Sequence, residues 1–157
     1  YEEHDLRLRA YFTEASNGEF NYTGKLSGAT QNFGGISVGE LYLNAAEGNL
    51  RSGQTAPALE LLNEFLALRY DAANWVPLNF TDSSELLDRI LEERRKELIG
   101  RGIRWVDLRR LNQEENPITL IRKVKGQQYE LLPNSLRYTF PIPQEEITRS
   151  GIAQNPR

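Results

Sequence analysis

The segment EERRKELIGRGIRWVDLRR, residues Glu92 to Arg110, carries the strongest structural information in this sequence. It joins the end of one amphipathic stretch to the start of another through Gly100-Arg101-Gly102. Seven basic and four acidic side chains surround a single tryptophan, Trp105. Apolar residues recur among these charges at regular intervals, namely Leu98, Trp105, Leu108 and Leu111. A solvated helix face rarely has so regular an apolar set, so the pattern predicts two helices joined by a glycine turn.

The charges of this segment are spaced for pairing within the chain. Acidic and basic residues interleave at i,i+3 and i,i+4, as Glu93 and Lys96 do, and this spacing favours intramolecular ion pairs. We therefore predict a structural lock in which Arg94, Arg104 and Asp107 form a bidentate network around the tryptophan. The alternative is a nucleic-acid patch, and the interleaved acids argue against it.

Composition places the chain among ordinary globular proteins. It has 157 residues, of which 39% are hydrophobic and 26% are charged. This length fits one domain, and the hydrophobic fraction is too high for wholesale disorder. The net charge is −3 and the pI is about 5.3, so bulk charge gives no attraction to phosphate backbones. We expect no nucleic-acid partner.

Several residue types and segments are missing from the sequence. It contains no cysteine, which excludes disulfides, thiolate metal sites and a cysteine nucleophile. It contains no methionine and begins Tyr1-Glu2-Glu3, so we expect a processed product or a fragment of a longer chain. There is no apolar run of the roughly 18 residues that a membrane helix needs, and no signal-peptide pattern.

Hydrophobic periodicity predicts helices in the middle of the chain. A first helix is expected from about Ile36 to Leu50 and ends at Ser52-Gly53. A second is expected after Thr55 as its N-cap, with Pro57 near its start. Their short connection predicts an antiparallel helical hairpin. A third helix is expected after a capping box at Asp82 and Glu85, and a short fourth over residues 103–112.

The helical hairpin fits one unit of a tetratricopeptide-like repeat. With Gly53 as the turn, Tyr42 occupies the large aromatic position, and Ala46 and Ala58 occupy the small positions where the helices cross. A small residue on each helix allows close approach of the backbones. One hairpin cannot bury its own apolar face, so further helices are expected beside it.

The flanking parts of the chain have weaker patterns. Residues 1–35 are rich in turn signals such as Asn17-Gly18 and are expected to be irregular, although residues 5–12 fit a strand or a helical turn. Residues 36–112 form the predicted helical core, and residues 113–157 a predicted extended, loop-rich tail. Alternation over residues 118–132 predicts a small β-hairpin in this tail.

Four groups of residues, in this order, resemble landmarks of the SusD/RagB family of nutrient-binding lipoproteins. They are Asp5-Leu6-Arg7; Gly39 to Glu47 with Asn63 and Arg69; Glu93 to Leu98 with Gly102 to Arg110; and Pro141 to Ile147 with Gln154-Asn155-Pro156. The third group contains the signature positions Glu93, Arg94, Arg104, Trp105, Asp107 and Arg110. One departure is Arg101, which stands where many members have an acidic residue. The resemblance covers nearly all of this chain but only the C-terminal part of the family.

This resemblance implies both a fold and a function. It implies a mainly α fold of tetratricopeptide-like helical hairpins, superhelix-like, with irregular loops and at most a small β-hairpin. It further implies a surface-exposed protein of the cell outer membrane that binds glycans or other nutrients. Its implied partner is a TonB-dependent transporter of the SusC type, and its only membrane attachment is a lipid anchor that this fragment lacks. We expect this part of the protein to be scaffold.

The residues themselves identify no reaction. Glycosidase chemistry needs two carboxylates in one cleft, roughly 5 to 9 Å apart, whereas the adjacent glutamate pairs here have diverging side chains. His4 is the only histidine, and no metal-ligand spacing occurs. We therefore expect no catalytic activity, no metal and no cofactor.

Aromatic residues next to amides in predicted loops are the candidate ligand contacts. Sugars stack their apolar faces on flat rings while amides bind their hydroxyls, and Asn74-Trp75, Phe80 and Tyr22 offer this pairing. The alternative is that Trp75 caps the neighbouring helical hairpin. Two other functions remain open: a tetratricopeptide-type protein-interaction module and, more distantly, a fragment of a glycoside-processing enzyme.

Overall fold

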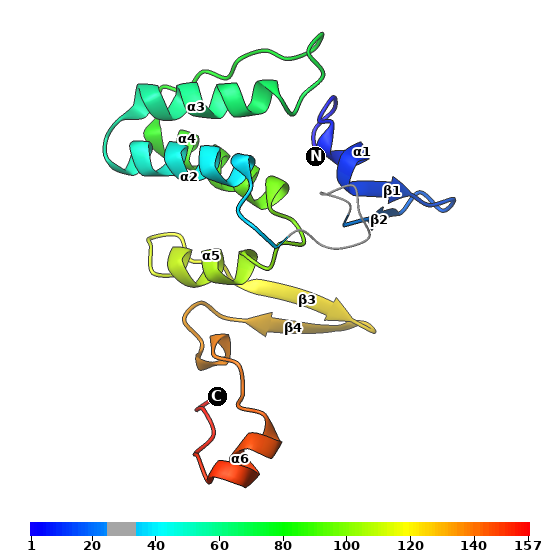
Figure 1. Ribbon diagram of the computed structural model, residues 1–157, viewed down its shortest axis with the longest axis vertical. Helices are drawn as coiled ribbons and strands as arrows, with labels where there is room; N and C mark the ends of the chain where they lie inside the picture. Colours follow the sequence, from blue (N-terminus) through cyan, green and yellow to red (C-terminus); the bar gives the residue numbers. More distant parts are fainter. Residues whose placement is uncertain (25–33) are drawn as a thin grey trace. The chain divides into compact units, whose positions relative to one another are not determined.

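Helices dominate the computed structural model, which describes residues 1–24 and 34–157 (Figure 1). The described residues form two compact units, Tyr1–Gly102 and Ile103–Arg157. The first unit contains α1 (Arg7–Tyr11), β1 (Phe12–Glu14), β2 (Phe20–Tyr22), α2 (Val38–Arg51), α3 (Thr55–Ala67) and α4 (Ser83–Glu97). The second contains α5 (Arg104–Leu111), β3 (Leu120–Val124), β4 (Gln127–Leu131), a 3-10 turn (Leu136–Tyr138) and α6 (Gln144–Ser150). The prediction of a mainly α fold is confirmed, and the single domain over residues 1–157 stays a prediction.

The beginning of the chain is more regular than the sequence indicated. Residues 5–12, which fit either a strand or a helical turn, end in helix α1, and β1 then pairs antiparallel with β2. Gly18 has φ +79° in the connection, so Asn17-Gly18 is the turn of a hairpin rather than a general loop signal. The expected irregular segment 1–35 therefore contains a helix and a strand pair. Its residues 25–33, Phe33 among them, lie outside the described residues.

Helices α2 and α3 form the predicted helical hairpin. Ser37 caps α2 by accepting a hydrogen bond from the Glu40 backbone N–H at 3.2 Å. Gly53, with φ +80°, makes the turn that the sequence assigned to it. The N-cap of α3 was wrong by one residue, because Thr55 already has a helical conformation and Gln54 occupies the cap position without a side-chain hydrogen bond.

Small residues bring these helices close together, as the repeat pattern requires. Ala46 and Ala58 are both fully buried, and Tyr42 lies with its ring centroid 6.5 Å from that of Phe65. The core of this unit consists of Leu43, Ala46, Leu50, Ala58, Leu62, Phe65, Leu66, Leu86 and Ile90. Its members come from α2, α3 and α4, so the hairpin buries its apolar face with a third helix.

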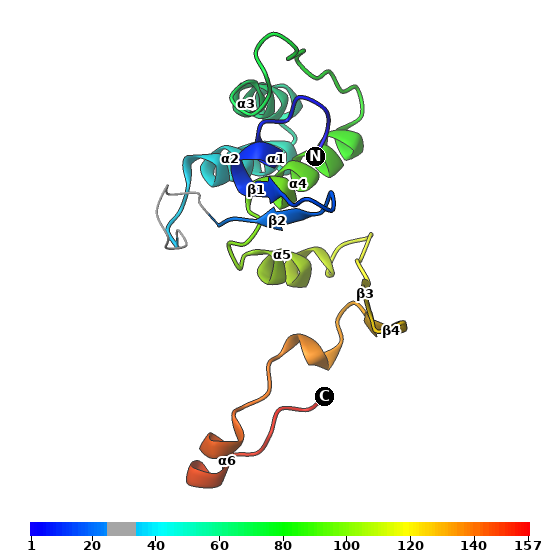
Figure 2. The ribbon, with the colours of Figure 1, turned by 90° about the vertical axis from the view of Figure 1, so that its right-hand side faces the viewer.

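Helix α4 supplies the additional helix that the hairpin needs. The Asp82 carboxylate accepts a hydrogen bond from the Ser84 backbone N–H at 2.8 Å, so the predicted cap at Asp82 is confirmed. Leu86 and Ile90 then face inward and are fully buried. Helix α2 contacts both α3 and α4 extensively, whereas α3 meets α4 at few positions (Figure 2).

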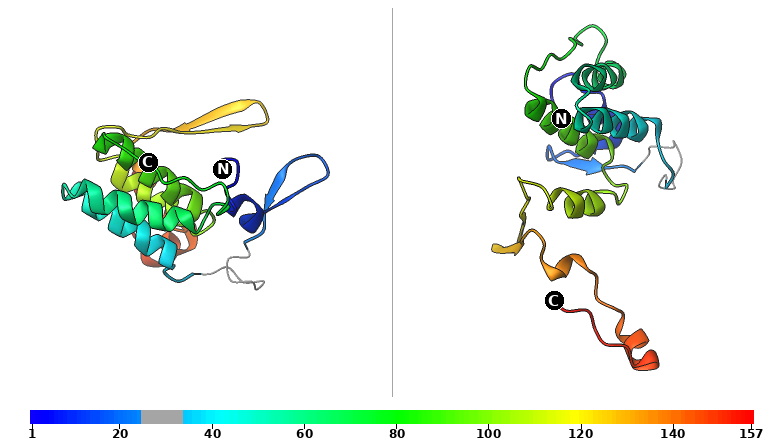
Figure 3. Two further views of the ribbon diagram at one scale, coloured as in Figure 1. Left: turned by 90° about the horizontal axis from the view of Figure 1, so that it is seen from above. Right: turned by 90° about the vertical axis from the view of Figure 1, so that its left-hand side faces the viewer.

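The second unit holds a β-hairpin between helical pieces. Strands β3 and β4 pair antiparallel from Leu120↔Leu131 to Val124↔Gln127 (Figure 3). Lys125 and Gly126 both have positive φ and form the two-residue turn. The hairpin predicted in the tail is confirmed, while the strand pair β1/β2 in the first unit was not predicted.

Across residues 1–24 and 34–157, none of the helices has the length and apolar character that crossing a membrane requires.

Two glycines after α4 give a matched test of the local packing. Gly100 and Gly102 have nearly equal φ, +72° and +74°, but only an added Cβ at Gly100 would overlap a neighbour, the Tyr22 ring. We expect Gly102→Ala to lower the free energy of unfolding by about 1–2 kcal/mol through backbone strain. Gly100→Ala should lower it by a further 1–3 kcal/mol, roughly, because the ring must move. Urea unfolding measures both losses, and equal losses would contradict the close contact with Tyr22.

Candidate functional site

A buried ionic cluster occupies the first unit, centred on Arg7. The Arg7 side chain is 2% exposed, and its guanidinium donates to both oxygens of Asp5 at 2.9 and 2.7 Å. It also donates to Glu93 Oε2 at 2.5 Å, across 86 residues of sequence. Burial acts to lower the pKa of Arg7, but the hydrogen bond and charge of Asp5 and the charge of Glu93 raise it overall. The guanidinium is therefore held in its charged form.

The cluster extends from Glu93 toward the surface. The Glu93 carboxylate pairs with Arg89 at 2.9 Å and with Lys96 at 3.1 Å, so the predicted pairing of Glu93 and Lys96 is observed. Glu2 joins both cations from the N-terminal segment, at 2.5 Å from Arg89 and 3.3 Å from Lys96. The hydrogen bond from Arg89 is the main reason that the pKa of Glu2 falls to about 2, against the opposing effect of partial burial.

A second carboxylate of α4, Glu97, closes the inner side of the cluster. Arg69 donates to both of its oxygens, at 3.0 and 2.8 Å, and Tyr11 donates to Oε2 at 3.2 Å. Burial, with the nearby negative charge of Glu97, raises the pKa of Tyr11 above its usual value. Gly39 lies directly against this pair, since an added Cβ would overlap Glu97. Residues of α1, α2 and α4 and of the turn after α3 therefore meet at one point.

This arrangement is suited to holding the unit together rather than to chemistry on a ligand. Glu93 is 0% exposed and Glu97 is 5% exposed, so a substrate has no access to either carboxylate. Each already pairs with at least two cations. General acid–base work needs a carboxyl group within hydrogen-bond reach of the reacting atom. The cluster supplies a rigid connection between the N-terminal segment and α4.

The other signature residues lie on either side of the division between the units. Arg94 belongs to the first unit and donates to Asn44 Oδ1 of α2 at 2.6 Å. Asp107 belongs to the second unit, is buried, and pairs with Arg110 one turn later at 3.1 Å. The network predicted for Arg94, Arg104 and Asp107 would join the two units, and it stays a prediction.

Trp105 packs against two other aromatic side chains of the second unit. Its indole stacks on Phe140, with ring centroids 5.2 Å apart and planes at 16°, and also packs on Tyr138 at 4.8 Å. Its Nε1–H donates to the Tyr138 carbonyl at 3.2 Å. Within residues 103–157 the tryptophan thus packs on the 3-10 turn and the extended segment after it. The sequence had assigned it to a junction between two helices, because nothing local linked positions 105 and 140.

Three of the four candidate ligand residues lie in the loop between α3 and α4. Trp75 packs on Tyr70 with ring centroids 5.1 Å apart, and both Trp75 and Phe80 are partly buried against the core of the first unit. Asn74 is exposed, and its amide donates to Asp71 at 3.2 Å. Packing accounts for much of the Trp75 surface, as the alternative from the sequence stated. A role of these residues in ligand binding stays a prediction.

The fourth candidate, Tyr22, lies on β2 instead of in that loop. Its hydroxyl donates to the Ile99 carbonyl at 3.1 Å, and its ring lies over Gly100 and meets Phe12 edge-on at 5.6 Å. The side chain remains 38% exposed. The structure therefore gives Tyr22 a packing role against the end of α4 and leaves part of its surface accessible.

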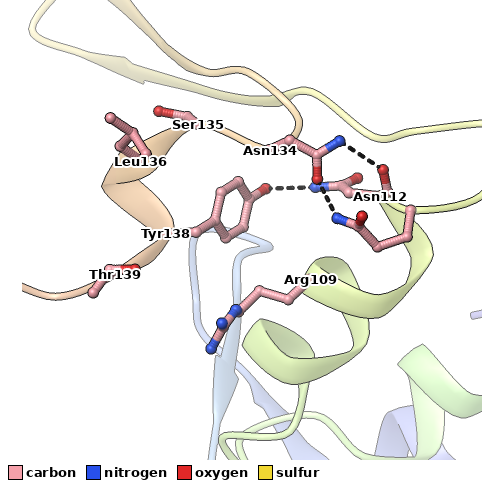
Figure 4. Close-up of a pocket in the computed structure, with 8 residues that line it drawn as sticks. Arg109, Asn112, Asn134, Ser135, Leu136, Tyr138 and Thr139 are labelled. Atoms are coloured by element: carbon pink, nitrogen blue, oxygen red, sulfur yellow. Dashed lines mark hydrogen bonds between the residues drawn. The ribbon is translucent and has the colours of Figure 1, made fainter. Parts of the chain in front are cut away.

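A polar cavity in the second unit was not found from the sequence. It has a volume of about 500 Å³. Its walls come from the end of α5 and the residues just after it, and from residues 134–139 that follow β4. They comprise Arg109, Asn112, Gln113, Asn134, Ser135, Leu136, Tyr138 and Thr139 (Figure 4). The local signal was Pro133-Asn134, which marks a turn but does not indicate what the turn faces.

Interlocked amides hold the two walls of this cavity together. Asn112 is 3% exposed, donates to the Tyr138 hydroxyl at 3.1 Å and accepts from the Ile118 backbone N–H at 2.8 Å. Asn134, with φ +58°, donates to the Asn112 carbonyl at 2.9 Å, and Gln113 donates to the Asn134 side chain at 2.5 Å. Asparagine tolerates this left-handed conformation better than most residues. The cavity is consequently preformed.

Arg109 is the charged group of this cavity. It lies in the last turn of α5, is exposed, and has no hydrogen-bond or ion-pair partner among the described residues. Its neighbour Arg110 is different, since it pairs with Asp107. The cavity thus combines one available guanidinium with amides and hydroxyls, a set of groups that can bind a polar ligand carrying negative charge.

Comparison with known proteins agrees with the sequence resemblance. The sequence model of the SusD family matches residues 11–157. A SusD-like protein of Formosa agariphila is 38% identical over 79 residues, which is 47% of this chain and 16% of that protein.

Two solved structures from Bacteroides vulgatus share the fold. One, named as a candidate sugar-binding protein, is 26% identical with a TM-score of 0.66, over 99% of this chain and 36% of its own. The other, named a SusD-like carbohydrate-binding protein, is 22% identical with a TM-score of 0.58, over 96% of this chain and 38% of its own. The chain therefore spans little more than a third of either solved protein.

Proposed function

Because this chain belongs to the SusD family, we propose that it is the C-terminal scaffold of a cell-surface protein that binds glycans or other nutrients. The observation that carries the proposal is the family match over residues 11–157, which includes the signature segment. Two solved proteins of the same fold have names that describe sugar or carbohydrate binding. The ligand of this protein is accordingly a carbohydrate or a similarly hydroxylated nutrient.

The structure supports the scaffold part of this proposal. The signature residue Glu93 is fully buried in the ionic cluster and has no surface for a ligand. Trp105 is engaged by two aromatic rings of its own unit. Side chains engaged in such packing act through stability, and ligand contacts then fall to loops and cavities.

The partner and location follow from the family rather than from the geometry. We propose that the parent protein is lipid-anchored at the outer membrane and passes its ligand to a TonB-dependent transporter of the SusC type. We also propose that it is not an enzyme. The inner carboxylates Asp5, Glu93 and Glu97 support this last point, because each is buried and paired with arginine.

Retention of the chain in glycan-containing native gels tests the binding function and the loop candidates together. We expect Trp75→Ala to weaken glycan binding about tenfold, since an aromatic contact contributes roughly 1 kcal/mol beyond its buried area. Tyr129→Ala is the matched control, because Tyr129 is a 50% exposed aromatic on β4 and should bind like the unaltered chain. Retention of Trp75→Ala equal to the unaltered chain would remove the loop from the site. Absence of retention on every glycan would contradict glycan binding by this part of the protein.

A further inference from the structure

We infer that the cavity of the second unit binds a uronic-acid residue of an acidic glycan, with Arg109 as the carboxylate contact. This inference rests on the proposed glycan-binding function and adds the chemical class of the ligand and a second place where it binds. The juxtaposition that carries it is a guanidinium with no partner in the described part of the chain, at a preformed, amide-lined cavity of about 500 Å³.

The Arg109 guanidinium indicates that the ligand carries a negative charge. Most arginines with a structural role in this chain pair with a carboxylate, as Arg7, Arg69 and Arg89 do in the first unit. Arg109 has no partner among residues 1–24 and 34–157, yet it lines the cavity. A guanidinium matches a carboxylate with two parallel hydrogen bonds, which a neutral sugar cannot offer. A ligand with one carboxylate completes this site.

The hydroxyl groups of the cavity wall indicate that the ligand is rich in oxygen atoms, as a sugar is. The Tyr138 hydroxyl accepts from Asn112 and keeps its own hydrogen for donation. Ser135 Oγ accepts from the Arg137 backbone N–H at 3.3 Å and likewise keeps a hydrogen. Thr139 adds a third hydroxyl to the lining. In Figure 4, Arg109 extends from α5 on the side of the Tyr138 ring away from Asn134. The lining of the cavity thus offers hydroxyl donors that suit sugar oxygens, in the same cavity as the Arg109 guanidinium.

Size and apolar surface fit a sugar better than a small inorganic anion. The volume is within the range of about 300–1,000 Å³ that ligand sites occupy. Leu136 is 58% exposed at the rim and offers an apolar contact for the C–H face of a sugar ring. A multiply charged phosphate is usually surrounded by several cations and backbone N–H groups, whereas this cavity has one arginine.

The test compares two probes with the same sugar chain, one with free carboxylates and one with its carboxyl groups neutralised as methyl esters. Calorimetric titration of the full chain uses an oligogalacturonate of three residues and its fully methyl-esterified form, with acetate as a probe for a bare carboxylate. We expect the charged trimer to bind at least about tenfold more tightly than the ester, because a hydrogen bond to a charged group is the stronger one. Acetate should bind far more weakly than the trimer, since it has no hydroxyls.

Two arginine variants locate the site. Arg109→Gln should weaken binding of the charged trimer about tenfold or more and leave binding of the ester unchanged. Arg149→Gln is the control, because Arg149 is 77% exposed on α6, does not line the cavity, and lies as far as 4.0 Å from the Glu145 carboxylate. It should bind the trimer like the unaltered chain. Thr139→Val should weaken both probes, since it removes a hydroxyl contact and no charge.

The outcomes separate this inference from the function on which it rests. Binding of neutral glycans without binding of the charged trimer overturns the inference and leaves the glycan-binding function intact. Equal binding by Arg109→Gln and the unaltered chain also overturns it. Absence of binding to any glycan, neutral or acidic, overturns the inference and also any glycan binding by this part of the protein.

Discussion

Arg7→Met is expected to lower the free energy of unfolding of the first unit by about 3–5 kcal/mol. The substitution keeps most of the side-chain volume but removes the charge that faces Asp5 and Glu93, both nearly fully buried. A buried carboxylate left without its cation pays the desolvation cost that the ion pair had offset. Asp5 is the more affected, because Glu93 retains Arg89 and Lys96. Urea unfolding followed by circular dichroism measures the loss.

Arg9→Met is the matched control for this substitution. Arg9 lies two residues further along the same short helix and is exposed, so its loss should change the stability by no more than about 0.5 kcal/mol. A double-mutant cycle with Asp5→Asn should give a coupling energy of at least about 1 kcal/mol, since the two side chains contact each other directly. Equal losses from Arg7→Met and Arg9→Met would show that the ionic cluster does not hold the unit together.

The ionic cluster also shows which contacts local sequence patterns do not predict. The positions of α2, α3 and α4 follow from apolar periodicity and from local signals such as the cap at Asp82, which act over a few residues. Arg7 and Glu93 are 86 residues apart, and no local rule links them. The sequence placed Glu93 in a structural lock but paired it only with its own helix. Its shortest ion pair, 2.5 Å to Arg7, comes from the N-terminal segment.

The polar cavity was missed for a related physical reason. Asn112 and Asn134 are 22 residues apart and flank the β3–β4 hairpin, so the hairpin brings them together. Asparagine is common in turns whatever the turn faces, and a sequence pattern does not distinguish a buried amide from an exposed one. The candidate aromatics were found because Asn-Trp and Asn-Phe stand out in a loop. Their surroundings, Tyr70 and the helical core, became visible only in the structure.

Phe65 connects the helical core to the ionic cluster. Its side chain is 1% exposed and belongs to the apolar cluster of α2, α3 and α4. Its ring also meets two guanidinium groups, with Arg69 Cζ 4.7 Å and Arg7 Cζ 5.8 Å from the centroid. Cations within about 6 Å of an aromatic face are attracted to it. The ring therefore shields the buried charges from water and at the same time fills the crossing of the helices.

Phe65→Ala is accordingly expected to lower the free energy of unfolding by about 3–5 kcal/mol, through lost burial and the remaining cavity. Phe65→Leu keeps most of the volume but no aromatic face, and should lose about 1–2 kcal/mol. Leu68→Ala is the control, because Leu68 directly follows α3 and is 69% exposed, so its loss should stay near 0.5 kcal/mol, roughly. Urea unfolding of the three variants ranks them. A loss below about 2 kcal/mol for Phe65→Ala would mean that the helices close over the missing ring, so that the guanidinium groups do not depend on it for shielding.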